Sequence, residues 1–183
     1  NLLMGPIDKA STFIPQIEKE YNLTNKEIGL AVFLICSGLI KKYVIADYVS
    51  LNFTDRVFEF PLRFTGVENL LAVYGATMAG YCDFSGYTDL ALAVGLLLGF
   101  KMIDNFNRPF KANSIADYWR RWHISLSTWL LGYLFRPLQI SLRNLKNYGT
   151  AIAIFVTFFA VGLWHGPNWT FIVFGLLHST YLI

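Results

Sequence analysis

Long apolar runs constrain this chain more than any other feature of its sequence. A helix that crosses a bilayer needs roughly 20 mostly apolar residues, and residues 149–164 (GTAIAIFVTFFAVGLW) approach that length without one charged side chain. Only 15% of all residues are charged and 55% are hydrophobic, whereas roughly a quarter are charged in soluble domains. The sequence therefore predicts an integral membrane protein.

Composition and charge exclude several other classes of protein. Disordered chains have low hydrophobicity, and collagen and coiled coils need sequence repeats that this chain lacks. The 15 Lys and Arg exceed the 12 Asp and Glu by only three, far below the basic footprint of a nucleic-acid partner. The 3 His and 2 Cys are scattered without the spacing of metal ligands, so no metal and no bound cofactor are expected.

The expected fold class is all-α, a polytopic bundle of transmembrane helices with interfacial or re-entrant helices. The apolar segments expected to span lie near 28–46, 66–82, 86–100, 149–164 and 168–183. The first qualifies only if Lys41 and Lys42 snorkel to an interface or face protein. Asn25-Lys26-Glu27 before it is a plausible helix start.

The block 101–148 differs from its neighbours. Its first part is basic, and its second part is apolar but broken by Pro137, so we expect interfacial or re-entrant structure there. The chain opens on Asn1-Leu2-Leu3 and closes inside an apolar run. Both ends look cut, and we expect a single partial domain, residues 1–183, from within a longer protein.

The histidines are the first candidates for chemistry, because ionisable groups at membrane depth are costly and mark functional sites by default. His165 stands in residues 162–167 (GLWHGP), where Gly-Pro breaks the helix, and broken membrane helices usually line a cavity. Neutral imidazole suits a base that activates a hydroxyl. The alternative, in which a histidine caps a carbonyl or bonds between helices, carries more weight for His123 and His178 than for His165.

The charged side chains have two interpretations. Asp83 and Asp89 are six residues apart and share no helical face, so we expect each to orient a neighbour or to pair with Arg108, Arg120 or Arg121. The basic stretch 101–121 is explained by the excess of Lys and Arg in cytosolic loops. It also suits the entrance to a binding site for an acyl donor that carries phosphate, since the guanidinium of Arg presents several N–H groups that bind phosphate together.

Four blocks of the sequence together resemble one family. They are residues 83–89 (DFSGYTD), 105–110 (NFNRPF), 118–127 (YWRRWHISLS) and 162–166 (GLWHG). In this order they resemble the membrane-bound O-acyltransferases, with the bacterial alginate O-acetyltransferase branch the nearest match. Residues 5–7 (GPI) and 38–47 (GLIKKYVIAD) fit the same branch.

The resemblance implies a multi-helix fold around a tunnel that joins the two membrane faces. It implies that His165 deprotonates the acceptor hydroxyl, and that His123 orients the donor or polarises its carbonyl. Transfer would be direct, from an acyl thioester such as acetyl-CoA or an acyl carrier. Residues expected to bind substrate are Arg120, Arg121, Trp122, Trp164, Asn107 and Arg108. Gly132 stands where the family often has Asp, so no acid is expected to act there.

The implied setting is the bacterial inner membrane, with the lipid bilayer, the acyl donor and an exported polysaccharide as partners. A periplasmic or extracellular acyltransferase would complete the transfer. Two alternatives stay open. The same fold acylates lipid, protein or teichoic acid with D-alanine, or the chain is part of a transporter or of a non-catalytic scaffold.

Overall fold

The computed structural model describes residues 5–183, and this part of the chain is all-α. Its one departure from helix and loop is an isolated antiparallel bridge between Phe106 and Trp122. The chain divides into two compact units, one ending at Asp104 and the other beginning at Asn105. Each unit is described by itself.

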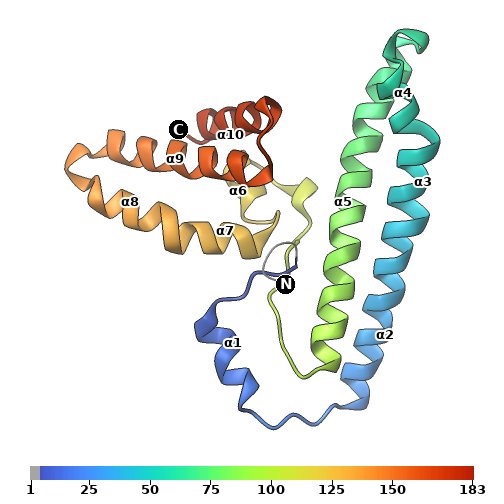
Figure 1. Ribbon diagram of the computed structural model, residues 1–183, viewed down its shortest axis with the longest axis vertical. Helices are drawn as coiled ribbons and strands as arrows, with labels where there is room; N and C mark the ends of the chain where they lie inside the picture. Colours follow the sequence, from blue (N-terminus) through green and yellow to red (C-terminus); the bar gives the residue numbers. More distant parts are fainter. Residues whose placement is uncertain (1–4) are drawn as a thin grey trace. The chain divides into compact units, whose positions relative to one another are not determined.

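A long helical hairpin forms most of the first unit (Figure 1). Its first arm is continuous over Asn25–Glu59, and its second arm is α5 (Gly66–Leu97). The segments of the first arm are α2 (Asn25–Leu39), η1 (Ile40–Ala46), α3 (Asp47–Val49), η2 (Ser50–Thr54) and α4 (Asp55–Glu59), and the 3₁₀ turn η3 (Pro61–Arg63) follows.

Both arms begin with the same capping arrangement. The Thr24 hydroxyl accepts a hydrogen bond from the backbone N–H of Glu27, and the backbone N–H of Thr24 donates to the Glu27 carboxylate in return. Thr65 and Glu68 repeat this pattern. Such boxes satisfy amide groups that have no partner within the helix. The helix start predicted at Asn25 is confirmed.

The two arms approach closely where glycines face one another. A Cβ added to Gly38 would lie 2.7 Å from the carbonyl oxygen of Gly86, and one added to Gly86 would lie 2.8 Å from the carbonyl oxygen of Gly38. Real side chains do not tolerate such distances. Small residues at a crossing let helix backbones approach in this way in membranes.

The lysines of the first arm face protein, which decides between the two possibilities for the predicted span. Lys41 donates to Asp89 at 2.7 Å, and Ser37 donates to the same carboxylate at 2.8 Å. Lys42 bridges Asp47 at 2.9 Å and Asp83 at 2.6 Å. The aspartates of α5 thus pair with lysines of the facing arm, which are not the arginines named as candidate partners from the sequence.

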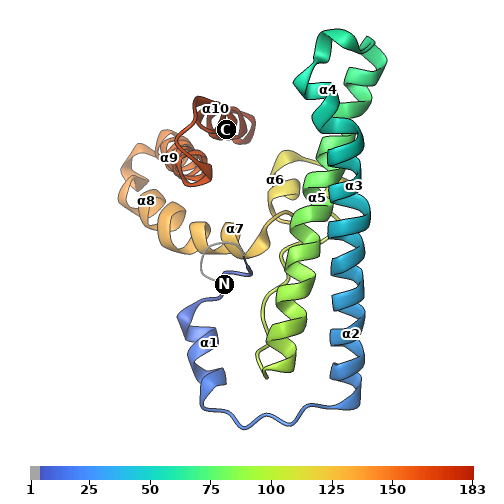
Figure 2. The same cartoon turned by 45° about the vertical axis from the view of Figure 1, so that its right-hand side comes forward.

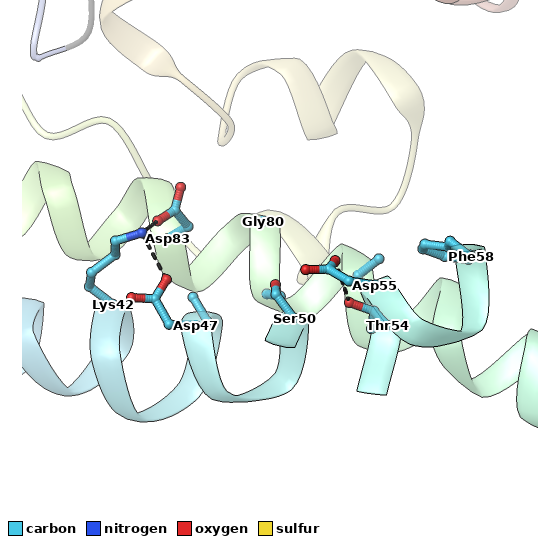
Figure 3. Close-up of a pocket in the computed structure, with 11 residues that line it drawn as sticks. Lys42, Asp47, Ser50, Thr54, Asp55, Phe58, Gly80 and Asp83 are labelled. Atoms are coloured by element: carbon cyan, nitrogen blue, oxygen red, sulfur yellow. Dashed lines mark hydrogen bonds and ion pairs between the residues drawn. The ribbon is translucent and has the colours of Figure 1, made fainter. Parts of the chain in front are cut away.

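A polar pocket of about 330 Å³ lies between the arms beside Lys42. Figure 3 shows Lys42 between Asp47 and Asp83, with Thr54 and Asp55 farther along the same arm. The π-helical segments η1 and η2 lie in the part of the arm whose side chains face α5 across this pocket. Turns of this π-helical kind are rare overall and occur frequently at functional sites.

The expectation of separate spans at 66–82 and 86–100 was wrong, because α5 is one helix of 32 residues. Asp83 and Asp89 interrupt the apolar pattern, but their ion pairs with the facing arm satisfy them without ending the helix. Among the described residues, two helices are long and apolar enough to cross a membrane: Asn25–Glu59 and Asn147–His165. They contain the segments predicted at 28–46 and 149–164.

Helix α1 (Ala10–Ile17) packs on the segment that follows α5. Phe13 stacks on Phe100 with ring centroids 4.9 Å apart. The Gln16 amide accepts from the backbone N–H of Lys101 at 2.8 Å and donates to its carbonyl at 3.3 Å. This pair of bonds gives the irregular segment a fixed partner within the first unit.

The second unit consists of short helices that lead into a helical hairpin (Figure 2). Helix α9 (Asn147–His165) packs against α8 (Arg136–Ser141) and against α10 (Trp169–Leu182). The remaining elements are η4 (Pro109–Lys111), α6 (Ile115–Trp119), α7 (Ile124–Leu130), η5 (Leu131–Phe135) and η6 (Arg143–Leu145). Helix α10 lies within the predicted segment 168–183.

Pro137 does not break its helix, contrary to the sequence-based expectation. The helix runs without interruption through α7, η5 and α8. The π-helical turn η5 lies directly before Pro137 and widens the backbone there. This relieves the clash between a proline ring and the carbonyl four residues earlier, which otherwise kinks a helix.

The crossing at Gly86 generates a stability prediction. Gly86→Ala forces the two arms apart and should lower the free energy of unfolding by about 1–3 kcal/mol, the usual effect of overpacking. Gly80→Ala on the same helix is the matched control, because a Cβ at Gly80 meets nothing within 4 Å. Thermal unfolding of the full-length protein in detergent measures both, and equal midpoints would contradict the close crossing.

Candidate functional site

His123 lies in one of two backbone segments, 105–107 and 121–124, that are joined by hydrogen bonds. The N–H of Asn107 donates to the carbonyl of Arg121 at 2.9 Å, and the N–H of Ile124 donates to the carbonyl of Asn105 at 3.0 Å. Between them, His123 has a φ of +46°, a conformation that costs a non-glycine residue about 1–2 kcal/mol. Such strain persists only where the surroundings impose it, and it clusters at functional sites.

The side-chain oxygen of Asn105 is the centre of a buried hydrogen-bond cluster. It receives the Ser125 hydroxyl at 2.6 Å and the Ser125 backbone N–H at 3.2 Å. Nδ1 of His123 lies 3.2 Å from the same oxygen. Asn105, Ser125 and His123 are 0%, 1% and 4% exposed, so this cluster is shielded from solvent and electrostatically strong.

Burial determines the charge state of His123. Removal from water disfavours the imidazolium form, and this desolvation, with the nearby charge of His165, lowers the pKa of His123 to about 4. The side chain is therefore neutral near pH 7, so that one ring nitrogen can accept a proton without an earlier deprotonation.

His165 ends α9, where the backbone turns sharply. Gly166 follows with a φ of +152°, and a Cβ there would lie 3.0 Å from the ring of Phe171. Only glycine adopts this conformation readily. The predicted helix break at Gly-Pro is confirmed, and it leaves His165 stacked near Phe171, with centroids 5.8 Å apart, and exposed in the described chain.

Trp164 lies next to both candidate catalytic histidines. Its ring centroid is 6.1 Å from that of His123 and 5.0 Å from that of His165. The two histidines, 42 positions apart in the sequence, thus share one neighbourhood within the second unit, and the charge of one acts on the other. A neutral imidazole within hydrogen-bond reach of a hydroxyl can take its proton.

His178 has a structural role. The indole N–H of Trp119 donates to Nδ1 of His178 at 3.2 Å, and the ring packs 4.4 Å from that of Phe174. The bond joins α6 to α10 within an aromatic cluster. This is the interhelical role that the sequence analysis gave as the alternative to chemistry.

Arg120 and Arg121 share Asp117 but differ in availability. Arg121 donates from Nε to Asp117 at 2.9 Å, whereas Arg120 is 3.6 Å from that carboxylate and 72% exposed. Partial burial acts to raise the pKa of Asp117, but hydrogen bonds from Arg121 and the Asn113 N–H, with both guanidinium charges, bring it below its ordinary value. Arg121 is thus part of the scaffold, and Arg120 is available to a ligand.

An apolar cavity of about 500 Å³ lies in the second unit with Arg120 among its lining residues. Its walls come from α6, the helix 124–141, α9 and the end of α10, and they include Trp119, Leu126 and Phe158. Small-molecule sites commonly have this size and an apolar lining with few polar groups.

The other predicted substrate-binding residues are spread around the same loop. Trp122 packs edge-to-face on Phe106 at 5.0 Å, and Asn107 accepts a weak bond from Arg121 at 3.5 Å. Arg108 is exposed at a φ of +48° and begins η4. Within residues 5–183, no three His, Cys, Asp or Glu side chains come together as a possible metal site.

The family model of the membrane-bound O-acyltransferases (MBOAT) matches residues 1–183 of the chain. The chain belongs to this family. Members of this membrane-bound family that are similar to the chain include a peptidoglycan O-acetyltransferase of Helicobacter pylori, 39% identical over 97% of the chain. A probable alginate O-acetylase of Azotobacter vinelandii is 39% identical over all of it.

A teichoic acid D-alanyltransferase of Bacillus subtilis is 31% identical to the MBOAT chain over 96% of its length. The chain spans 34%, 36% and 46% of these three relatives, about a third to a half of each protein. All three are named for the transfer of an acyl group.

Sequence reasoning missed Asn105 and Asp117 as members of this candidate site. Asp117 had a readable signal, since Arg120 and Arg121 follow it by three and four residues on a helical turn. Asn105 had none, because it stands two positions from Asn107 and an extended segment places both on the same side. Only the pairing of 105–107 with 121–124 makes Asn105 the buried one.

The buried His123 generates a pH prediction for stability. Its pKa is about 4 when folded and 6.5 when unfolded, so the unfolded state binds more protons and stability falls as pH drops through this window. We expect a loss of up to about 3 kcal/mol between pH 6.5 and pH 4. Chemical denaturation of the full-length protein across this range measures it.

His123→Gln supplies the comparison, because its amide keeps polar atoms at the site without titrating. The variant should lose less stability than the wild type over the same window, whatever its stability at pH 7. Parallel pH profiles for the two proteins would show that His123 does not titrate in this way.

Proposed function

We propose that the protein containing this chain is a polytopic acyltransferase of the bacterial inner membrane. It would move an acyl group, most simply acetyl, from a thioester donor to hydroxyls of an exported polysaccharide. The observation that carries this proposal is the meeting of His123 and His165 beside Trp164 at a helix break. The names of the relatives support the reaction type.

His165 takes the proton of the acceptor hydroxyl in this proposal. The oxygen attacks the thioester carbonyl, an ester bond forms, and the carbon–sulfur bond breaks. The departing thiolate then takes the proton from the imidazolium, so the products are an ester and a free thiol. Each step needs one proton carrier that alternates between neutral and charged forms, which suits histidine.

Arg120 would bind the donor at its phosphate groups. Both acetyl-CoA and an acyl carrier hold the thioester at one end of a pantetheine arm whose other end carries phosphate, and guanidinium binds phosphate through paired hydrogen bonds. The cavity beside Arg120 offers apolar walls for the arm between phosphate and thioester. Nothing in this scheme requires a metal or a resident cofactor.

The acceptor would be a polysaccharide, as the names of the alginate and peptidoglycan relatives suggest. A partner acyltransferase outside the membrane would complete delivery to the polymer. D-alanylation of teichoic acid is the second candidate, because one relative at 31% identity is named for it. The two candidates differ in acyl group and acceptor but share the chemistry of the two histidines.

His165→Ala should abolish transfer, because it removes the proposed proton carrier. Membrane insertion and abundance should stay unchanged, because the smaller alanine side chain introduces no steric clash. The measurement is the O-acetyl and D-alanine content of exported glycans in cells that carry the full-length protein. His178→Phe is the matched histidine control, because it keeps the ring packing around Phe174 and removes an imidazole outside the proposed chemistry. Equal ester content in His165→Ala and wild-type cells would refute the assignment of the base.

Arg120→Ala should raise the KM for the donor by about tenfold, the loss of roughly 1.4 kcal/mol of charge-assisted binding, with a smaller change in kcat. Arg143→Ala in the turn between α8 and α9 removes the same charge from a different part of the second unit. Steady-state transfer by the full-length protein in membranes measures both variants. An unchanged KM in Arg120→Ala would contradict donor binding by Arg120. It would favour the interpretation in which the basic stretch 101–121 acts only in membrane topology.

A further inference from the structure

The orientation of the Asn105 amide follows from one unambiguous donor. A backbone N–H only donates, and that of Ser125 points at the side chain of Asn105 from 3.2 Å. The atom of Asn105 that faces it must therefore be the oxygen and not the nitrogen. The Ser125 hydroxyl, 2.6 Å from the same atom, can donate as well and agrees with this assignment.

The same oxygen determines which nitrogen of His123 carries the proton. Nδ1 of His123 lies 3.2 Å from it, and a carbonyl oxygen accepts but does not donate. Nδ1 must therefore be the N–H of the ring. A neutral imidazole has one such proton, so Nε2 has a lone pair and acts as an acceptor.

We propose that Asn105 is a positioning residue that holds His123 in the Nδ1-protonated tautomer, so that Nε2 of His123 serves the site as a hydrogen-bond and proton acceptor. The catalytic meaning of this inference rests on the proposed acyl transfer. The tautomer decides between the two roles considered for His123, which are orienting the acyl donor and polarising its carbonyl. Orientation of the donor by accepting a bond, for example from one of its amide N–H groups, is compatible with this tautomer, whereas polarising the thioester carbonyl requires an Nε2–H.

Two features keep the arrangement from relaxing. The backbone bonds Asn107 to Arg121 and Ile124 to Asn105 hold the two side chains at a fixed separation. Burial favours the neutral ring, whose pKa is about 4, and His165 at the end of α9 is the titratable neighbour whose charge acts in the same direction. With the ring neutral and one nitrogen committed to donation, the state of the other nitrogen is determined.

His178 provides an internal contrast. There Nδ1 accepts from the indole N–H of Trp119 at 3.2 Å, so the neutral ring carries its proton on Nε2. The two histidines therefore have opposite tautomers in one unit, each imposed by the partner of Nδ1. In an experiment that detects the tautomer of each histidine, His178 can therefore serve as the internal reference for His123.

The direct test is nitrogen NMR of the full-length protein in lipid bilayers with ¹⁵N-labelled histidine. The His123 signals are identified by their loss in His123→Gln. At pH 7 we expect Nδ1 of His123 to have the shift of a proton-bearing nitrogen and Nε2 that of a bare one, with the reverse for His178. A proton on Nε2 of His123 would overturn the inference whether or not the protein transfers acyl groups.

The kinetic test uses Asn105→Asp, whose carboxylate accepts the same hydrogen bonds but adds a negative charge beside Nδ1. The charge raises the pKa of His123, so Nε2 becomes protonated at higher pH and stops accepting. We expect the acid limb of the kcat–pH profile to move up by more than one pH unit, with activity restored in alkaline buffer. A gain of activity at low pH would show that His123 donates from Nε2, against the inference.

Asn105→Leu removes the acceptor at similar size and should lower kcat by roughly 100-fold or more at every pH, as a wrong tautomer does in other histidine enzymes. Ser125→Ala is the matched comparison, since it removes one bond to Asn105 but keeps the backbone N–H that orients the amide; its loss of kcat should be much smaller than that of Asn105→Leu. If Asn105→Leu fails to accumulate, Asn105→Asp and the NMR experiment still decide. Absence of transfer in the wild type would overturn the proposed function alone, because the tautomer is measured separately.

Discussion

Polar groups in apolar surroundings must find their partners within the chain, and most of the described structure follows from that requirement. In the hairpin, Lys41 and Lys42 are accommodated because α5 presents Asp89 and Asp83 opposite them. In the second unit, the Asn105 oxygen receives three donors that would otherwise be buried without an acceptor. A buried polar group without a partner costs about 1–3 kcal/mol, more when it is charged, so the pairing determines which helix faces can meet.

The requirement has different consequences for the three histidines. His123 and His178 each have one ring nitrogen engaged by a neighbouring side chain, and that neighbour determines where the proton resides. His165 instead lies at a helix end and is in contact with three aromatic rings. A side chain with a variable proton suits a base, whereas a side chain with a fixed proton suits a positioning role. The proposed division of labour between His165 and His123 follows this difference.

The sequence predicted the features that depend on local pattern and missed those that depend on pairing. The start of the first long helix at Asn25 and the break after His165 follow from capping and Gly-Pro chemistry, and both are confirmed. The continuity of α5 was missed, because an apolar pattern counts Asp83 as an interruption and does not register Lys42 on the facing arm. Pro137 was expected to break its helix, since the widened turn before it has no recognisable residue signature. Asn105 could not be distinguished from Asn107 without the bonds that join two segments about 16 residues apart in the sequence.

The bonded pair of segments 105–107 and 121–124 has a consequence for how this region can vary. It closes the intervening residues into a loop whose two ends are tied together by backbone hydrogen bonds, which do not depend on side-chain identity. Lengthening such a loop costs little, because closure entropy grows only with the logarithm of its length. The loop carries Arg108 and Arg120, while His123 lies at its closed base. Under the proposed function, changes of charge, shape or length in the loop would alter which donor is bound without displacing the imidazole, so that ligand choice and chemistry could vary separately.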